Sequence, residues 1–385
     1  MSKVRILAVG IGGYANVYLE SLLASENKNF EIVGMVDVFP QGCRFLDTLK
    51  EMGVPLYADM ESFYKEHSAD LCIITTPIFL HTRQILTALK NGSHVMCEKP
   101  LSGVSEDEKI INDAANKAGK FVMIGYQWSY SEAIGKLKVD IMSGKFGKPI
   151  SMKTIVLWPR PRDYFTRGGG WGGKIAAADG TLMYDSIANN AAAHYLHNML
   201  YLLGDKTDKS AEALNVDCSL FRANDIENFD TAEITFETEK GCKCVFLATH
   251  ATEKLLDPVF EYTFENGKVV FGEEFSEITA FMNNGEKLVY GNPFKDVNEK
   301  IYKAIEYAAN NQLSNECSVT TAAAHTRCIE AVQKFPINTV SKDKLAEREN
   351  FVYVKGLYEE MTECFKTGRR FKDSEYYRWL VNDGN

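Results

Sequence analysis

The sequence lacks a long hydrophobic run: none of its apolar stretches approaches the roughly 20 residues that a membrane-spanning helix needs. It also lacks a basic run, and its net charge is −9, which disfavours a nucleic-acid-binding surface. None of its nine cysteines forms a C-x-x-C pair, which argues against a zinc site and against a disulfide framework. These absences predict a reduced, cytoplasmic protein with no metal, no membrane partner and no nucleic-acid partner.

The composition is that of an ordinary globular protein. With 385 residues, 45% hydrophobic and 25% charged, the chain is long enough for two domains with cores of their own. A short apolar segment follows two charges at the N-terminus, but it breaks at Gly10 without the small-residue cleavage site of a signal peptide. We therefore interpret it as a first strand.

That first strand leads into a glycine motif. The apolar run 4–9 is typical of a strand buried on both faces, and residues 17–23 predict a helix. The G-x-G-x-x-A pattern between them is suited to binding a dinucleotide, because its glycines allow a tight turn and a close approach to the pyrophosphate, and the helix N-terminus attracts the phosphates. The predicted cofactor contacts here are Gly10, Gly12, Gly13, Tyr14 and Ala15.

An acidic residue, Asp37, ends the second predicted strand. A carboxylate at this place can accept hydrogen bonds from both ribose hydroxyls and would repel a 2′-phosphate. The sequence therefore predicts NAD as the cofactor. Arg44 keeps NADP as the second choice.

Strands and helices go on alternating to about residue 125, which predicts an α/β Rossmann domain with a doubly wound parallel sheet. Proline cannot continue a strand, so Pro100 should hold Lys99 at the carboxyl end of its strand, the edge where such sheets bind ligands. Further cofactor contacts are predicted along this edge at Thr75, Thr76, Pro77, His81, Glu98 and Lys99.

The second half changes its pattern. After about residue 210, period-2 stretches separated by Glu239-Lys-Gly241 and Glu265-Asn-Gly267 predict antiparallel strands with one buried face. We expect an α+β C-terminal domain with an open, mostly antiparallel sheet. The predicted domains are 1–127 for NAD binding, 128–335 for substrate binding and oligomerisation, and 336–385 as an extension packed on the second domain.

The motifs of the first half together resemble those of the Gfo/Idh/MocA oxidoreductases. The resemblance is carried by Asp70-x-x-x-Ile-x-Thr-Pro77, His81, Ala88-Leu89, Gly92-x-His94-Val95 and Glu98-Lys99-Pro100. It is good over the first 150 residues and looser to about residue 335. It implies a nicotinamide-binding domain, a C-terminal sheet that makes a homodimer or homotetramer, and contact of Lys99 with both the reacting hydroxyl and the nicotinamide ribose.

The resemblance also implies a catalytic histidine on a helix that ends at Gly204. In this family an Asp stands four residues before that histidine; counted back from Gly204, the pair falls on Asn190 and His194. Counted forward from Asp185, Asn189 would fall on the histidine position instead. We prefer the first register because it keeps a histidine, and we expect Asn190, His194 and His197 on one helical face. Asn190 can orient the ring but brings no charge.

A glycine-rich, basic and aromatic stretch, 158–174, is the expected substrate loop. Its three arginines suit an anionic or heavily hydroxylated ligand, and its aromatic rings can stack on a sugar. The predicted substrate contacts are Arg162, Tyr164, Trp171, His197 and Tyr126.

These observations predict an NAD-dependent oxidoreductase that acts on a CH–OH group of a sugar, polyol or glycoside. Lys99 would hold the oxygen, and His194, with Asn190 beside it, would take the proton. The charge missing at Asn190 keeps a rival open, a glycoside hydrolase or lyase that retains NAD and oxidises the sugar only transiently. A nicotinamide-linked sensor without activity and an imine or biliverdin-type reductase remain as further alternatives.

Overall fold

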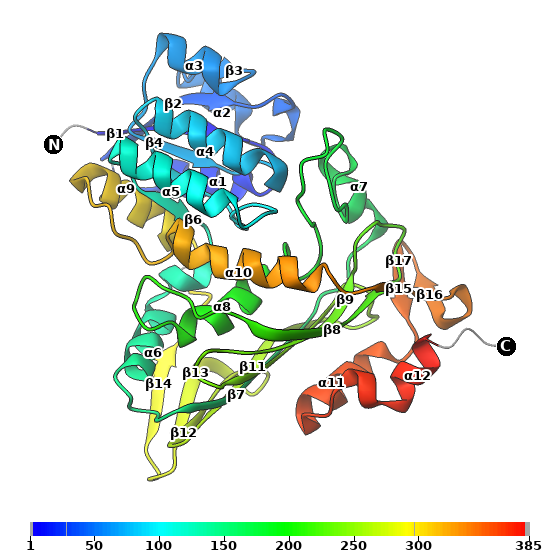
Figure 1. Cartoon of the computed structure of the whole chain (residues 1–385). Coiled ribbons are helices and arrows are strands. Elements are labelled where there is room, and N and C mark those ends of the chain that lie inside the picture. The colour runs from blue at the N-terminus through cyan, green and yellow to red at the C-terminus, as the bar shows by residue number, and fades with distance from the viewer. Residues whose placement is uncertain (1–2, 28, 296, 382–385) are drawn as a thin grey trace. The chain divides into compact units, whose positions relative to one another are not determined.

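The computed structural model describes residues 3–27, 29–295 and 297–381. The chain forms two compact units: unit 1 consists of residues 1–131 and 296–323, and unit 2 of residues 132–295 and 324–385. The predicted boundaries treated the chain as consecutive blocks, whereas unit 1 takes in a segment from the second half, coloured yellow to orange in Figure 1. No helix of the described ranges is long and apolar enough to cross a membrane.

Unit 1 is built on a six-stranded parallel sheet with the strand order β3-β2-β1-β4-β5-β6, which confirms the predicted doubly wound fold. The strands are β1 (Val4–Val9), β2 (Phe30–Val36), β3 (Leu56–Tyr57), β4 (Leu71–Ile74), β5 (His94–Cys97) and β6 (Val122–Ile124). The helices are α1 (Ala15–Ala24), α2 (Leu46–Glu51), α3 (Met60–Glu66), α4 (His81–Lys90), α5 (Asp107–Ala118) and α9 (Glu299–Asn310).

Strands β4 and β5 are buried along their whole length, as is expected of parallel strands that are rich in apolar residues and covered by helices. Helix α4 contacts α3, α5 and β5. The late helix α9 packs against β1, β4 and β5, and the Tyr302 hydroxyl donates a hydrogen bond to the Ser21 carbonyl on α1 at 3.0 Å. Helix α9 is thus an integral part of the Rossmann unit.

Unit 2 is built on a nine-stranded mixed sheet in the order β14-β13-β12-β11-β7-β10-β9-β8-β15. All neighbours are antiparallel except β7 with β10 and β8 with β15, so the prediction of an open, mostly antiparallel sheet is confirmed. The strands are β7 (Pro149–Leu157), β8 (Leu214–Arg222), β9 (Thr231–Glu237), β10 (Lys243–Thr249), β11 (Leu256–Phe264), β12 (Gly267–Gly272), β13 (Phe275–Met282), β14 (Lys287–Gly291) and β15 (Ile337–Thr339).

Besides short 3-10 turns, the described residues also form a two-stranded ribbon and six further α-helices. They are β16 (Leu345–Arg348), β17 (Phe351–Val354), α6 (Glu132–Met142), α7 (Arg162–Gly170), α8 (Ala193–Leu203), α10 (Val319–Val332), α11 (Leu357–Thr367) and α12 (Glu375–Val381). Helix α7 is not regular: Gly168 and Gly169 have positive φ, so the chain kinks inside it.

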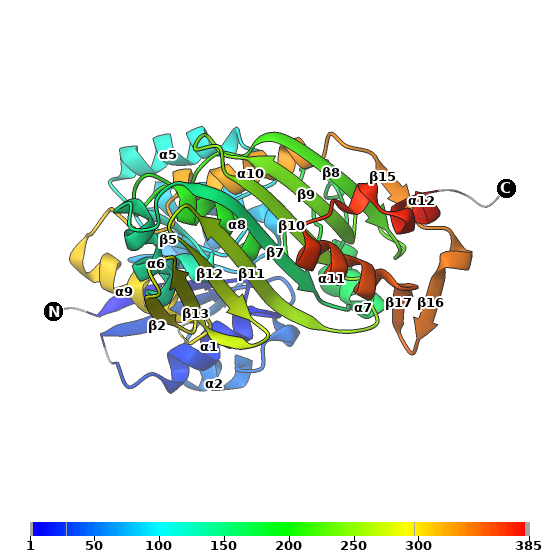
Figure 2. The same cartoon turned by 90° about the horizontal axis from the view of Figure 1, so that it is seen from below.

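The central strand β7 packs on both faces. On one face, Thr154 lies 3.1 Å from the Tyr262 hydroxyl, which also accepts a hydrogen bond from Asn198 of α8. On the other face, Ile155 and Leu157 join the core formed with α11 and α12. Figures 1 and 2 show α8 and α11 on opposite sides of this sheet. The strand is therefore buried at nearly every position of its second half, although its sheet is mostly antiparallel.

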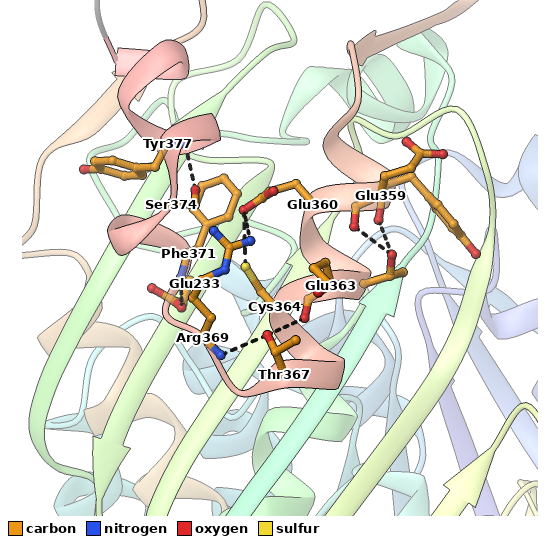
Figure 3. Close-up of polar contacts among 12 residues, drawn as sticks. Glu233, Glu359, Glu360, Glu363, Cys364, Thr367, Arg369, Phe371, Ser374 and Tyr377 are labelled. Atoms are coloured by element: carbon orange, nitrogen blue, oxygen red, sulfur yellow. Dashed lines mark hydrogen bonds and ion pairs between the residues drawn. The ribbon is translucent and has the colours of Figure 1, made fainter.

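The C-terminal segment is fastened to the sheet by polar contacts as well as by its core. The Phe371 amide donates to the Glu233 carboxylate of β9 at 2.7 Å, and Arg369 pairs with Glu360 at 2.8 Å (Figure 3). Arg370 lies 3.2 Å from both Glu233 and Asp217. The C-terminal segment is thus an integral part of unit 2.

Candidate functional site

In unit 1 the glycine loop lies at the carboxyl end of β1, where the sequence placed it. Gly10 has φ of +76°, and a Cβ there would lie 2.8 Å from the Thr76 Cγ2 atom, so only glycine fits. Gly12 faces Gly42, whose Cα would lie 3.5 Å from an added Cβ, while the space around a Cβ at Gly13 is open. The loop therefore offers bare backbone just before α1, which suits a pyrophosphate.

Asp37 is fixed beside this loop. Its Oδ2 accepts the Ile11 amide at 2.7 Å and its Oδ1 accepts the Phe39 amide at 2.7 Å. The carboxylate thus connects the glycine loop to the end of β2 and remains partly exposed. A carboxylate next to a glycine loop is what a dinucleotide needs for its ribose, so the residues present fit NAD.

The loops after β4 and β5 are held together by His81, which is 1% exposed. One ring nitrogen lies 2.8 Å from the Pro100 carbonyl and the other 2.9 Å from the Thr76 carbonyl. Burial lowers the pKa of His81, although both carbonyls favour the charged ring. We interpret His81 as a residue that positions the cofactor-side loops, because its polar atoms face the backbone. Pro77 lies in the loop that it holds.

Glu98 is the centre of a buried ion pair that the sequence did not predict. Its Oε1 accepts hydrogen bonds from Lys300 of α9 at 2.5 Å and from the Tyr18 hydroxyl of α1. Lys300 also donates to the Gly125 carbonyl at 3.0 Å. Burial acts to raise the pKa of Glu98, but Lys300, Lys99 and the hydrogen bonds outweigh it and the pKa is lowered. Glu98 is therefore a fixed anion within the unit.

Lys99 follows this anion at the edge of the sheet and is partly exposed. Its amide donates to Glu98 Oε2 at 3.1 Å, and its peptide bond to Pro100 is cis. Its charge is one of the causes that lower the Glu98 pKa. Tyr126, a predicted substrate contact, lies in the same unit just after β6 and is fully buried, and burial raises its pKa well above the ordinary value.

Unit 2 brings Asn190 against a carboxylate. The Asn190 side-chain amide donates to Asp185 Oδ1 at 2.7 Å, and the Gly173 amide donates to Asp185 Oδ2 at 2.6 Å. Asp185 is 3% exposed. The negative charge that position 190 lacks is thus supplied five residues earlier.

Helix α8 begins at Ala193, so the prediction that Asn190 lies on the helix is wrong. Asn190 belongs to the preceding turns, because its amide bonds to the Ser186 carbonyl and its own carbonyl accepts the Ala193 amide. His194 lies in the first turn of α8, with Tyr195 beside it at 6.2 Å between ring centroids.

His197 lies deeper, 1% exposed, stacked on Tyr201 and 6.5 Å from the His325 ring. Burial, with the positive charge of nearby Lys138 and the His325 ring, lowers its pKa well below the ordinary value. A neutral ring buried this deeply packs inside the unit, so we do not propose His197 as a substrate contact.

The arginine-rich loop divides into two parts. Arg162 is exposed and pairs with Glu347 at 2.6 Å. Arg167 lies over the Tyr164 ring at 3.7 Å from its centroid and over the Trp171 ring at 4.5 Å. Arg160 lies 5.2 Å from the Tyr164 centroid. Two of the predicted substrate contacts, Tyr164 and Trp171, thus form a cluster with Arg160 and Arg167. The third, Arg162, instead forms an ion pair with Glu347.

Sequence reasoning assigned no role to five residues that the structure places among these contacts: Tyr18, Arg160, Arg167, Asp185 and Lys300. Arg160 and Arg167 belong to the loop 158–174 that the sequence predicts to bind substrate. Asp185 is the residue from which the alternative register of the catalytic histidine was counted. Lys300 left no signal, because its partner lies some two hundred residues away, at Glu98.

The comparisons with known proteins agree with this geometry. Residues 4–126 match the Gfo/Idh/MocA model, described as an oxidoreductase family with an NAD-binding Rossmann fold. This segment, which carries the Rossmann sheet, is thus similar to the NAD-binding domain of the Gfo/Idh/MocA family. The match confirms the predicted resemblance and the predicted nicotinamide cofactor, NAD, at the level of the family.

The curated relatives include sugar and polyol dehydrogenases. Glucose-6-phosphate 3-dehydrogenase of Bacillus subtilis is 28% identical over 153 residues, 40% of this chain and 41% of that enzyme. Myo-inositol 2-dehydrogenase of Thermotoga maritima is 21% identical over 286 residues, 73% of this chain and 78% of that enzyme. The first of these matches covers only about two fifths of the relative's length.

Among solved structures, the WlbA dehydrogenase of Bordetella pertussis, in complex with NADH and UDP-GlcNAcA, has a TM-score of 0.70 at 21% identity. That similarity covers 86% of this chain and 96% of the other. A levoglucosan dehydrogenase in complex with NADH and levoglucosan has a TM-score of 0.68 at 17% identity. These likenesses extend the common fold to both units.

Proposed function

We propose that the protein is an NAD-dependent oxidoreductase that acts on a CH–OH group of a sugar or polyol. The observation that carries the proposal is the carboxyl edge of the sheet in unit 1, where a bare glycine loop follows β1, an anchored Asp37 follows β2, and Lys99 follows β5. The family match and the sugar and polyol dehydrogenases among the relatives support it.

NAD, when bound, supplies the hydride acceptor. The glycine loop would hold its pyrophosphate and Asp37 its adenosine ribose. Lys99 would bind the substrate oxygen and stabilise the negative charge that develops on it. The buried Glu98 keeps the backbone before Lys99 in place through its bonds to Lys300 and Tyr18.

His194 is the proposed general base in unit 2. The Asp185–Asn190 pair supports this role, because it puts a carboxylate one hydrogen bond from the position where the family has its Asp. The missing charge was the reason to consider the glycoside hydrolase or lyase that retains NAD. With Asp185 in place that reason weakens, and we favour the plain dehydrogenase. Homo-oligomer formation and a cytoplasmic location stay predictions.

The test is NADH formation at 340 nm by the purified chain with NAD and a panel of sugars and polyols. We expect turnover, and we expect Lys99→Met and His194→Ala to lower kcat at least 100-fold, while the NAD affinity of the His194 variant stays within about twofold. Near-normal turnover in either variant would remove that residue from the mechanism.

The same sample separates the two reaction classes. Nucleotide that survives purification, together with cleavage of a glycoside without net NADH, would favour the hydrolase or lyase. An empty protein that makes NADH in proportion to oxidised sugar would favour the dehydrogenase.

A further inference from the structure

Two guanidinium groups of unit 2 lie together without an acidic partner. In the described ranges no carboxylate lies within ion-pair distance of Arg160 or Arg167, although the chain as a whole carries a net charge of −9. The Nε atom of Arg160 is buried and has no hydrogen-bond partner there. The Arg167 side chain donates to the Tyr164 carbonyl, an uncharged acceptor.

Three carboxylates that lie in this loop or bond to its residues have other hydrogen-bond donors. Asp163 accepts from the Asn350 amide at 2.9 Å, and Asp257 accepts from the Trp158 indole at 3.0 Å. Asp185 accepts from Gly173 and Asn190, as described above. These three carboxylates therefore accept hydrogen bonds from donors other than the two arginines.

Aromatic rings hold the two guanidinium groups in place. Arg160 lies 5.4 Å from the Trp158 ring centroid, and both arginines flank the Tyr164 ring. His250 lies 5.4 Å from Tyr164, with a ring nitrogen 2.8 Å from the Trp158 carbonyl. Burial, with the positive charge of both arginines, lowers the pKa of His250 to about 3, so it is neutral and adds no charge.

One ring contact links the cluster to helix α8, which carries the proposed general base within unit 2. The Trp158 ring makes an edge contact with Tyr195 at 5.6 Å, and Tyr195 follows His194 at the start of α8. A substrate whose reacting hydroxyl lay near His194 would thus have the arginines on the Trp158 side. A guanidinium group binds carboxylate and phosphate oxygens through two parallel N–H bonds, a geometry that a neutral hydroxyl cannot match.

We infer that Arg160 and Arg167 form an anion subsite, and that the substrate is a sugar or polyol that carries a carboxylate or a phosphate. This inference rests on the proposed function and specifies its substrate class. The aromatic rings set the positions of the two arginines. The negative charge of the bound substrate would neutralise them, because no protein carboxylate of the described residues pairs with either one. A purely structural role for the stacked arginines would require no such anion.

The experiment compares D-glucose, D-glucuronate and D-glucose 6-phosphate with the full chain and NAD, by NADH formation and by ligand-observed NMR. We expect kcat/KM, or binding, to favour one of the anionic sugars at least 30-fold over glucose. The planar and tetrahedral anions differ in shape, so whichever is preferred identifies the carboxylate or the phosphate as the ligand group.

Arg160→Met and Arg167→Met keep an unbranched apolar stem in place of the arginine stem and remove the charged guanidinium group. Each should raise KM for the anionic sugar at least 30-fold and leave values for glucose within threefold, while the matched control Arg369→Met, which loses a pair with Glu360, should change neither. Arg160→Lys and Arg167→Lys, which keep the charge, should recover part of the anion preference, and they replace any methionine variant that does not fold.

Equal values for neutral and anionic sugars, or variants that weaken both alike, would overturn the inference and leave the dehydrogenase proposal standing. Preferential binding of an anionic sugar in the NMR experiment, without NADH from any substrate, would support the anion subsite and overturn the dehydrogenase proposal.

Discussion

Replacing Lys300 with Met tests how unit 1 holds the catalytic edge. The Lys300 ammonium is 0% exposed and the Glu98 side chain 8%, with 2.5 Å between Nζ and Oε1. Removing one partner of such a buried pair leaves an uncompensated charge, which costs about 3–5 kcal/mol. Glu98 keeps its hydrogen bond from Tyr18 and the nearby charge of Lys99, so we expect a loss near the lower limit.

The assay is hydrogen exchange of the peptide that covers β5, because the Glu98 amide bonds to the Ile74 carbonyl within the parallel sheet. A loss of about 3–5 kcal/mol corresponds to a fall in protection of roughly 100- to 5,000-fold. The matched control is Lys303→Met on the same helix. Lys303 pairs with Glu316 at 2.5 Å, but both side chains are about a quarter exposed, 25% and 24%, so we expect a loss of at most about 1 kcal/mol.

The pH dependence of the stability loss in Lys300→Met tests whether the loss comes from an ionised Glu98. In the wild type the folded-state pKa of Glu98 is lowered, so its contribution to stability is present above the unfolded pKa and is lost as the pH falls through the folded pKa. Without Lys300, burial should raise that pKa, and the penalty should be larger at pH 7 than at pH 5. A fall in protection below tenfold at pH 7, or no difference between Lys300→Met and Lys303→Met, would refute the reasoning.

Three further predictions follow from the same geometry. Asp37→Ala should weaken NAD binding at least tenfold in calorimetry and NADP binding less, because the carboxylate fixes the Ile11 amide and would bind the adenosine ribose; equal losses would count against that role. Asp185→Asn should lower kcat at least tenfold, and the exchange Asp185→Asn with Asn190→Asp should restore much of it by returning the charge; a swap as inactive as the single variant would contradict the pairing. His250→Asn should flatten the loss of stability below pH 6.5: the folded pKa of about 3 lies under the unfolded value, so the unfolded chain binds the extra proton and the wild type loses up to about 1.4 kcal/mol per pH unit, measured by thermal unfolding.

The Rossmann unit could be predicted from sequence because its signals are local. Each strand of the sheet is a short apolar run, the glycine motif follows the first of them, and Pro100 marks where β5 ends. Parallel topology then places the carboxyl ends of β1, β4 and β5 along one edge, so the positions of Gly10, Thr75 and Lys99 followed from connectivity alone. The period-2 stretches predicted the sheet of unit 2 in the same way.

Pairing over long sequence separations could not be predicted, since neither partner carries a mark of the other. In the sequence, Lys300 is one of several charges on an amphipathic helix. In the structure, α9 packs against the sheet of unit 1, and this contact buries Lys300 against Glu98. The start of α8 was misplaced for a related reason: Asn190 bonds to Asp185 and to the turn before the helix, and this tertiary contact prevails over helical periodicity.

The sequence by itself determined the two folds, the cofactor class and the edge on which Lys99 stands, because hydrophobic period and glycine placement are properties of neighbouring residues. Only the tertiary structure decided which charges meet. It brought Asp185 to Asn190 and Lys300 to Glu98. It also paired Arg162 with a carboxylate, whereas Arg160 and Arg167 lie against aromatic rings. Electrostatic partners act through space over a few ångströms, and that proximity exists only once the chain has folded.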